Sequence, residues 1–282
     1  MPDITHALLN SLSISPLLIG NLPNADSFDR SLFQKASTAK ELNLHQKLGH
    51  LYEQALGLML DLSANTQIIG QNIQIYDAHK KTLGELDFIV HDLLLDRYIH
   101  LELGVKFYLA YKAENEWFFP GPNDRDNWPK KLARLQDHQL TLTKIPEAHQ
   151  LLRNSFNIKD ITTQQLIYGC LFVPINHQGP EPKLEFMAKE ARIAKWLYAE
   201  QWQDYLSDHE LVYVIPKMLW PVIPHNDFEP FYKSYTAEDF LIQFRGQGAM
   251  FVSHDFKKTY YLAPEGWPVS FKTNAMIENQ SE

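Results

Sequence analysis

The chain has 282 residues, of which 45% are hydrophobic and 12% aromatic, enough for one large domain or for a core with a substantial appendage. Its formal net charge of −8 argues against a general nucleic-acid coating protein but leaves room for a local basic groove. No apolar run approaches the roughly 20 residues of a membrane span, and Cys170 is the only cysteine, so we expect a cytoplasmic protein without a membrane helix or an internal disulfide.

The first predicted elements follow an N-terminal arm over residues 1–40 that we expect to be irregular or a short helix. From Glu41 to Leu62, apolar residues recur at spacings of three or four, which predicts an amphipathic helix. Glu53 lies beside its apolar stripe. A short alternation from Gln67 to Asp77 then predicts a β-strand.

A pair of strands is predicted from Leu83 to Tyr108, and we expect the chain to be organised around it. Apolar residues alternate along both strands, so one face is expected to be continuously apolar. The other face carries four charged residues, Glu85, Asp87, Glu102 and Lys106. Carboxylates and a lysine that face the same way on neighbouring strands favour a site for a hard metal ion. The alternative is a solvent-facing group on an ordinary hairpin.

A loop rich in Pro, Gly, Asn and aromatic residues, Trp117–Trp128, follows. Its aromatic side chains either form a stiff rim on which bases could stack or pack into the core. A helix is predicted over residues 128–141, with Lys131 and Arg134 on one side. That side is either a solvated face or a row of phosphate contacts. A strongly apolar strand from Gln164 to Ile175 comes next.

A Gly- and Pro-rich segment at 176–182 is the best internal boundary. It divides a core over residues 41–175 from an α+β extension over residues 176–282, which we expect to pack on the core. A helix is predicted from Leu184 to about Tyr205. Three short strands are predicted further on, at Leu211–Ile215, Met250–Val252 and Tyr260–Leu262.

Several common site motifs are absent. The sequence contains no GxxxxGK[ST], GxGxxG or HExxH, no CxxC pair and no GxSxG. The corresponding nucleotide, zinc and acyl-transfer sites therefore have no support.

The predicted order up to residue 175 is helix, strand, strand, strand, helix, strand. With Asp87 on the second strand and Glu102 on the third, it resembles the core of the PD-(D/E)XK nuclease superfamily. More narrowly, the chain resembles a bacterial family of uncharacterised proteins assigned to that superfamily. The segments that carry this likeness are LGHLYEQAL, TLGELDFIV, HLELGVKFYL, GPN and KLARLQDHQL. The resemblance implies an α/β fold, with a restriction-endonuclease-like core (αβββαβ) and a mixed central sheet.

The resemblance also implies a role for each matching residue. Asp87 matches the aspartate that binds the metal, and Glu102 matches the acid of the second half-motif. Glu53 matches a helix glutamate that many members add as a further metal ligand. Lys106 would be the catalytic lysine that steadies the attacking water and the phosphate. Gln139 resembles a glutamine of exonuclease-like branches.

The lysine departs from the superfamily pattern, which places it two residues after the acid. Position 104 is Gly here, and the lysine is at position 106. A regular strand would separate Glu102 and Lys106 by about 13 Å. A bulge at Gly104 would shorten that distance, and without one Lys106 would be merely adjacent to the site.

The implied function is a metal-dependent nuclease that hydrolyses a phosphodiester bond of DNA or RNA with Mg²⁺ or Mn²⁺. Gln139, Lys131, Arg134 and Trp128 are candidate substrate contacts. The alternative is a catalytically inactive nuclease-like scaffold that binds nucleic acid or a protein partner through the same cleft. The acidic balance and the displaced lysine favour the scaffold, whereas the three aligned carboxylates favour the enzyme.

Overall fold

The structure, a computed structural model, describes residues 4–33, 40–208 and 210–268. The α-helices are α1 (Ile4–Ile14), α2 (Leu48–Leu62), α3 (Trp128–Asp137), α4 (Pro146–Phe156), α5 (Trp202–Tyr205) and α6 (Ala237–Phe244). The strands of the N-terminal part are β1 (Asp26–Ser27), β2 (Thr66–Tyr76), β3 (Thr82–Asp92), β4 (Arg97–Leu109), β5 (Tyr111–Ala113), β6 (Glu116–Phe118) and β7 (Thr162–Pro174). The remaining strands are β8 (Ile193–Leu197), β9 (Leu211–Val214), β10 (Lys233–Thr236), β11 (Ala249–Ser253) and β12 (Thr259–Leu262).

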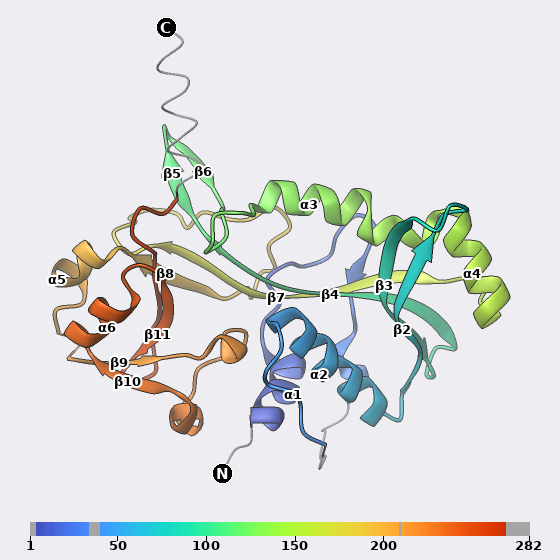
Figure 1. The fold of residues 1–282 in the computed structure, drawn as a ribbon, viewed down its shortest axis with the longest axis horizontal. Coiled ribbons are helices and arrows are strands. Elements are labelled where there is room, and N and C mark those ends of the chain that lie inside the picture. The colour runs from blue at the N-terminus through green and yellow to red at the C-terminus, as the bar shows by residue number, and fades with distance from the viewer. Residues whose placement is uncertain (1–3, 34–39, 209, 269–282) are drawn as a thin grey trace, which may run out of the picture.

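The fold is α/β, with a mixed sheet of ten strands along the long axis of the molecule (Figure 1). The strand order is β10-β9-β11-β12-β8-β7-β4-β3-β2, and β1 pairs with β7 beside this path. Strands β2, β3 and β4 form an antiparallel meander, whereas β4, β7, β8 and β12 run parallel to one another. The predicted strand pair therefore lies toward the β2 edge of the sheet and not at its centre, because β8 to β12 extend the sheet on the far side of β7.

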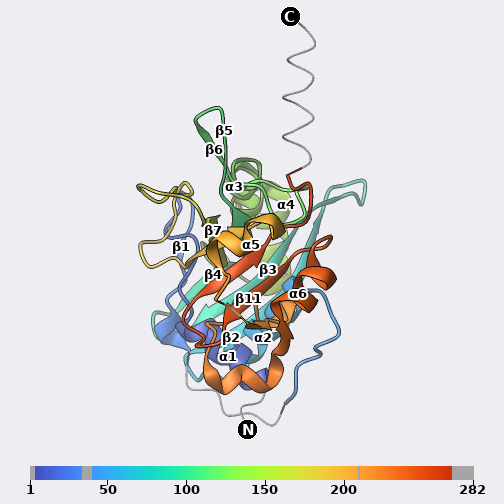
Figure 2. The same ribbon diagram turned by 90° about the vertical axis from the view of Figure 1, so that its left-hand side faces the viewer.

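Helices cover both faces of the sheet near the strand pair. Helices α1 and α2 lie on one face, and α3 and α4 lie on the other (Figures 1 and 2). Helix α2 begins at Leu48, later than the periodicity indicates, and buries Leu51, Tyr52 and Leu56. No helix within the described ranges is long and apolar enough to cross a membrane.

The expectation of one continuously apolar face on β3 is wrong. Phe88 and Val90 pack in the cluster with α1 and α2, whereas Leu86 and Ile89 pack in the cluster with α4. The alternation breaks at Asp87, opposite Asn72, whose φ of 53° is in the left-handed region. Helices cover both faces of the sheet here (Figures 1 and 2), so the side chain of Asp87 is half-buried and not solvated on an open face.

The helix expected from Leu184 to Tyr205 is also wrong. Residues 193–197 form β8, which inserts in parallel between β7 and β12, and the stretch is helical only at its end, in a 3₁₀ turn at Ala199–Gln201 and in α5. Trp196 is buried and donates its indole N–H to the Ala110 carbonyl at 2.9 Å. Hydrogen bonding to β7 and β12 outweighs the local helical pattern of these residues. The periodicity of the sequence gives no sign of these distant partners.

The sheet continues without a break across the segment at 176–182, through the β7–β8 pair. The three short strands predicted after it are present as β9, β11 and β12. At the other end of the chain, α1 buries Leu8, Leu9 and Leu12 completely or almost so. Residues 1–3 and 34–39 of the expected arm, and 209 and 269–282 of the expected extension, lie outside the described residues.

Candidate active site at the β3–β4 fork

Strands β3 and β4 separate at the point where the two predicted acids lie. Their ladder runs from Asp92 paired with Arg97 to Phe88 paired with Leu101. Asp87 and Glu102 are the next residues in this register, but β3 continues along β2 while β4 continues along β7. We call Asp87, Glu102 and the backbone around them the fork. The sequence prediction that both acids lie on neighbouring strands of one sheet is confirmed.

Asp87 is held against β4 by its own side chain. It is half-buried, and its Oδ2 accepts a hydrogen bond from the Leu103 backbone N–H at 2.9 Å. Burial raises the pKa of Asp87 to about 7, and the charges of Glu53 and Glu85 raise it further against the Leu103 hydrogen bond and Lys106. This carboxyl therefore titrates near neutral pH.

Glu102 is the more deeply buried acid, with 4% of its surface exposed. Its Oε1 accepts a hydrogen bond from the Gln139 side-chain amide, while its Oε2 has no hydrogen-bond partner among the described residues. Burial raises its pKa well above the usual value, and the charge of Asp87 raises it further. An unpaired carboxylate oxygen in a buried place is costly unless a proton or a cation occupies it.

His100 lies beside Glu102, on the same face of β4. It is fully buried, and its Nε2 is 3.8 Å from Glu102 Oε2. Neither ring nitrogen has a hydrogen-bond partner within the described part of the chain. Burial lowers the pKa of His100 to about 4, so the ring is neutral at physiological pH. The sequence analysis missed this residue, although its position two before Glu102 on a strand puts both on one face.

The bulge proposed at Gly104 is absent. The β4–β7 ladder runs residue by residue from Ile99 to Leu109 without a register shift. Lys106 therefore keeps regular strand spacing from Glu102, about 13 Å between α-carbons. It is half-buried, and burial and the Lys131 charge lower its pKa. The irregular backbone lies across the ladder at Gly169, where φ is +147° and a Cβ would lie 1.6 Å from the Lys106 carbonyl oxygen.

Helix α3 brings a second lysine to the site. Lys131 is half-buried, and its charge opposes the raised pKa of Glu102 more strongly than that of Lys106 does. Arg134, one turn later, is exposed. Helix α3 ends at Asp137, so Gln139 lies in the following 3₁₀ turn. From there its side-chain amide donates a hydrogen bond to Glu102.

Trp128 is not a stacking platform. Only 2% of its surface is exposed, its ring packs on Tyr108 with centroids 5.7 Å apart, and its indole N–H donates to the Glu185 carbonyl at 3.1 Å. Trp117 is partly buried against the same cluster. The core-packing alternative therefore holds for Trp128, because a base cannot reach a ring enclosed on both sides.

Glu53 approaches the fork from α2. Its side chain is 20% exposed and lies 3.2 Å from His50 Nδ1. Its charge raises the pKa values of both Asp87 and Glu102. Within the described ranges, however, no three His, Cys, Asp or Glu side chains stand close enough together to hold a metal ion. The fork thus offers one buried carboxylate, Glu102, and one half-buried carboxylate, Asp87, with Glu53 at its margin.

Comparisons with known proteins give one finding. No curated protein and no solved structure matches the chain, and no link to the PD-(D/E)XK superfamily is shown. One family model, described as "Domain of unknown function (DUF1853)", matches residues 15–246. The matched range includes the fork, Glu53, Lys106 and Lys131, and most of the ten-stranded sheet. The chain belongs to this DUF1853 family.

Proposed function

We propose that the protein is a metal-dependent nuclease that hydrolyses a phosphodiester bond of DNA or RNA. The observation that carries the proposal is the fork, where Asp87 and Glu102 lie next to each other in register and both are withdrawn from water. Two carboxyl groups that resist ionisation lower the stability of the folded protein at neutral pH, and such groups are concentrated at functional sites. A shared cation is the simplest ligand that would offset their repulsion.

The arrangement of α2, β2, β3, β4, α3 and β7 supports a restriction-endonuclease-like core. A meander of three antiparallel strands is followed by a helix and a strand that pairs in parallel with the third. The acids lie where the second and third strands separate, with one helix on each face. This is the element order that the resemblance to PD-(D/E)XK nucleases implies.

The donor set of the fork fits Mg²⁺ or Mn²⁺. Carboxylate oxygens are hard ligands, and Mg²⁺ is commonly held by one or two carboxylates together with water and substrate phosphate. Asp87 and Glu102 would hold the ion, and Oε2 of Glu102 is a buried carboxylate oxygen without a hydrogen-bond partner among the described residues. Glu53 would support it from the margin. When bound, such an ion lowers the pKa of a water molecule and neutralises charge on the phosphate.

The neighbouring side chains would orient Glu102 and supply positive charge for a bound phosphate group. Gln139 fixes one oxygen of Glu102 and so sets the direction of the other. Lys131 adds positive charge on the α3 side, and Lys106 adds a second charge further along β4. His100 lies on the buried side of Glu102, with Nε2 3.8 Å from Oε2, and burial keeps its ring uncharged at pH 7. Exposed Arg134 extends the positive charge along the outer surface of α3.

A second candidate is a nuclease-like scaffold that binds nucleic acid or a protein partner without cleaving it. The regular spacing of Lys106 and the absence of a ready three-carboxylate group within the described residues favour this candidate. It predicts binding through the same face with no requirement for a divalent ion.

Cleavage assays separate the two candidates. Purified protein is incubated with labelled single- and double-stranded DNA and RNA in Mg²⁺, in Mn²⁺ or in chelator, beside Asp87→Asn protein purified in the same way. The nuclease predicts ion-dependent cleavage by the wild type only. Binding without cleavage in any ion would favour the scaffold. Equal cleavage by the wild type and the variant would exclude the fork as the catalytic site.

A further inference from the structure

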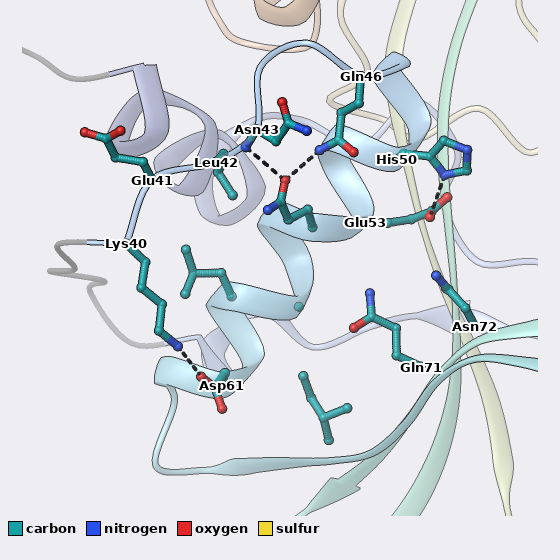
Figure 3. A pocket seen from close by; sticks show the side chains of 14 residues that line it. Lys40, Glu41, Leu42, Asn43, Gln46, His50, Glu53, Asp61, Gln71 and Asn72 are labelled. Atoms are coloured by element: carbon teal, nitrogen blue, oxygen red, sulfur yellow. Dashed lines mark hydrogen bonds and ion pairs between the residues drawn. The ribbon is translucent and has the colours of Figure 1, made fainter.

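A polar groove opens beside the fork, between residues 40–46, helix α2 and strand β2 (Figure 3). Its volume is about 590 Å³. Side-chain amides form much of its lining, from Asn43, Gln46, Gln54, Gln71 and Asn72. Glu53 and His50 stand at one end, as Figure 3 shows, and no function considered above uses the rest of the groove.

The groove and the fork share a wall. Gln71 pairs with Phe88 and Ile73 pairs with Leu86, so Asn72 is the residue of β2 directly across from Asp87. Opposite residues of antiparallel strands have Cβ atoms about 5 Å apart. Glu53 lines the groove, and its charge acts on Asp87. A molecule in this groove would therefore lie next to a phosphate at the fork.

Two consecutive amides of β2 line the groove because the strand is irregular there. Neighbouring residues on a regular strand point to opposite faces, but Asn72 has a φ of 53°, and both Gln71 and Asn72 line the groove. Both residues are exposed, and neither side chain hydrogen-bonds to another residue in the described ranges. Each amide can thus offer a donor and an acceptor to a ligand.

The charges of the groove disfavour an anionic ligand. It contains three carboxylates, on Glu41, Glu53 and Asp61. Among the described residues, Lys40 is the one lysine or arginine that lines it, and its Nζ lies 3.1 Å from Asp61. A phosphate would meet net negative charge here, whereas a neutral group with hydrogen-bonding edges would not.

The groove also has apolar surface, from Leu42, Leu58 and Ile68. A planar ligand with polar edges and apolar faces would match both kinds of lining. A nucleobase has this character, and Asn and Gln side chains recognise base edges through paired hydrogen bonds. A base within a duplex is stacked and paired, so only an unpaired base could enter a groove of this kind.

We propose that this groove binds one unpaired base of a single-stranded nucleic acid, next to the phosphate that the fork engages. The proposal rests on the nuclease function proposed above, and it names single-stranded nucleic acid as the substrate class. The fork would bind the charged backbone and the amide groove would bind the neutral base.

Binding measurements with three probes test the groove. Fluorescence anisotropy in Ca²⁺, a hard cation that carboxylate oxygens also hold, compares a single-stranded oligonucleotide, an abasic oligonucleotide with the same number of phosphates, and the duplex. We expect the wild type to bind the abasic probe and the duplex on the order of tenfold more weakly than the single strand, the scale of one lost base contact. Gln71→Leu should bind the single strand about as weakly as the abasic probe, with abasic binding unchanged. Gln67→Leu is the control, since Gln67 is exposed on the same strand but outside the groove.

Equal wild-type affinity for the single strand and the abasic probe would overturn the proposal, as would equal effects of the two leucine substitutions. Duplex binding as tight as single-strand binding would also overturn it. If one of these results comes with cleavage that depends on Asp87, only the groove is excluded and the nuclease function stands. If no probe is bound and no nucleic acid is cleaved, both proposals fail.

Discussion

The fork and the β8–β12 half of the sheet differ in how their buried polar side chains are paired. At the fork, four buried side-chain atoms lack a hydrogen-bond partner, both ring nitrogens of His100, Oε2 of Glu102 and Oε1 of Gln139. Among the described residues from 176 to 268, the Tyr232 hydroxyl is the one such atom. That half is filled instead by aromatic contacts, with Phe251 packed against Trp202 and Phe240 at centroid distances of 5.5 and 4.7 Å.

The carboxylates differ in the same way. Asp255, exposed in a turn after β11, has its pKa lowered to about 2 by hydrogen bonds from the Ser253 hydroxyl and the Lys257 backbone. Burial raises the pKa of Asp87 to about 7. The first arrangement stabilises a turn, whereas the second lowers stability at neutral pH. The difference is consistent with the proposal that the fork holds a ligand.

The largest effect is expected from Asp87→Asn. The amide keeps the shape and still accepts the hydrogen bond from Leu103, but it removes the charge that would hold the ion. We expect cleavage to fall at least about a hundredfold, measured as the initial rate in Mn²⁺. Asp255→Asn, the matched change in the other half, should leave the rate unchanged. A similar loss of rate in both variants would contradict the contrast drawn here between the fork and the β8–β12 half of the sheet.

Glu102→Gln should stabilise the protein while it inactivates the fork. Burial holds the folded pKa of Glu102 above its unfolded value, so wild-type stability is greatest below the unfolded pKa and is lost as the pH rises through the folded one. Glutamine cannot ionise and should avoid that loss. We expect its free energy of unfolding at pH 8, in chelator, to exceed the wild-type value by about 1–3 kcal/mol.

The same denaturant titrations at pH 5 supply the control for Glu102→Gln, because most of the gain should disappear there. A variant that is less stable than the wild type at both pH values would contradict the account of the fork. It would mean that Glu102 stabilises the fold as an ion.

Lys131→Ala should reduce cleavage by about tenfold, less than the loss of an acid, because the lysine would act on the phosphate and on Glu102 without holding the ion. Its removal also raises the pKa of Glu102, so the rising limb of the pH–rate profile should move to higher pH. Lys130→Ala, an exposed neighbour on α3, is the control. Equal effects of the two changes would mean that Lys131 acts only by attracting nucleic acid non-specifically, and not on Glu102 or the reacting phosphate.

The smallest effect is expected from Lys106→Ala. Regular pairing of β4 with β7 keeps this lysine away from Glu102, so we expect only a few-fold loss of cleavage rate. A hundredfold loss would show that Lys106 reaches the reacting phosphate despite the regular strand. It would also restore the role that the superfamily resemblance implies.

Much of this layout could be predicted from periodicity. The β3–β4 pair, α2, α3 and β7 follow the apolar patterns of the sequence, although the alternation on β3 breaks at Asp87. The burial of Glu102 could not be predicted, because it depends on α3, the 3₁₀ turn at Gln139 and His100 meeting over one face of β4. Strand β8 was missed because pairing with β7 and β12 overrides local helical preference.

The site was predicted less completely than the fold. Lys131 was expected only as a phosphate contact, since nothing in a linear pattern shows that α3 lies over Glu102. The exclusion of Trp128 from the surface likewise depends on its packing against Tyr108. The amide groove depends on the backbone at Asn72, and a single residue in the left-handed region leaves almost no trace in sequence periodicity.

Calorimetric titration of Mn²⁺ into the wild type and Glu102→Gln, at pH 8 and pH 6, tests the central claim most directly. Metal binding requires ionised carboxylates, and the pKa of Asp87 is raised to about 7. The fork therefore predicts one site in the wild type that binds at least about tenfold more weakly at pH 6, with proton release, and no such site in the variant. Equal Mn²⁺ affinity in both proteins, or wild-type affinity that does not change with pH, would contradict a metal site made by Asp87 and Glu102.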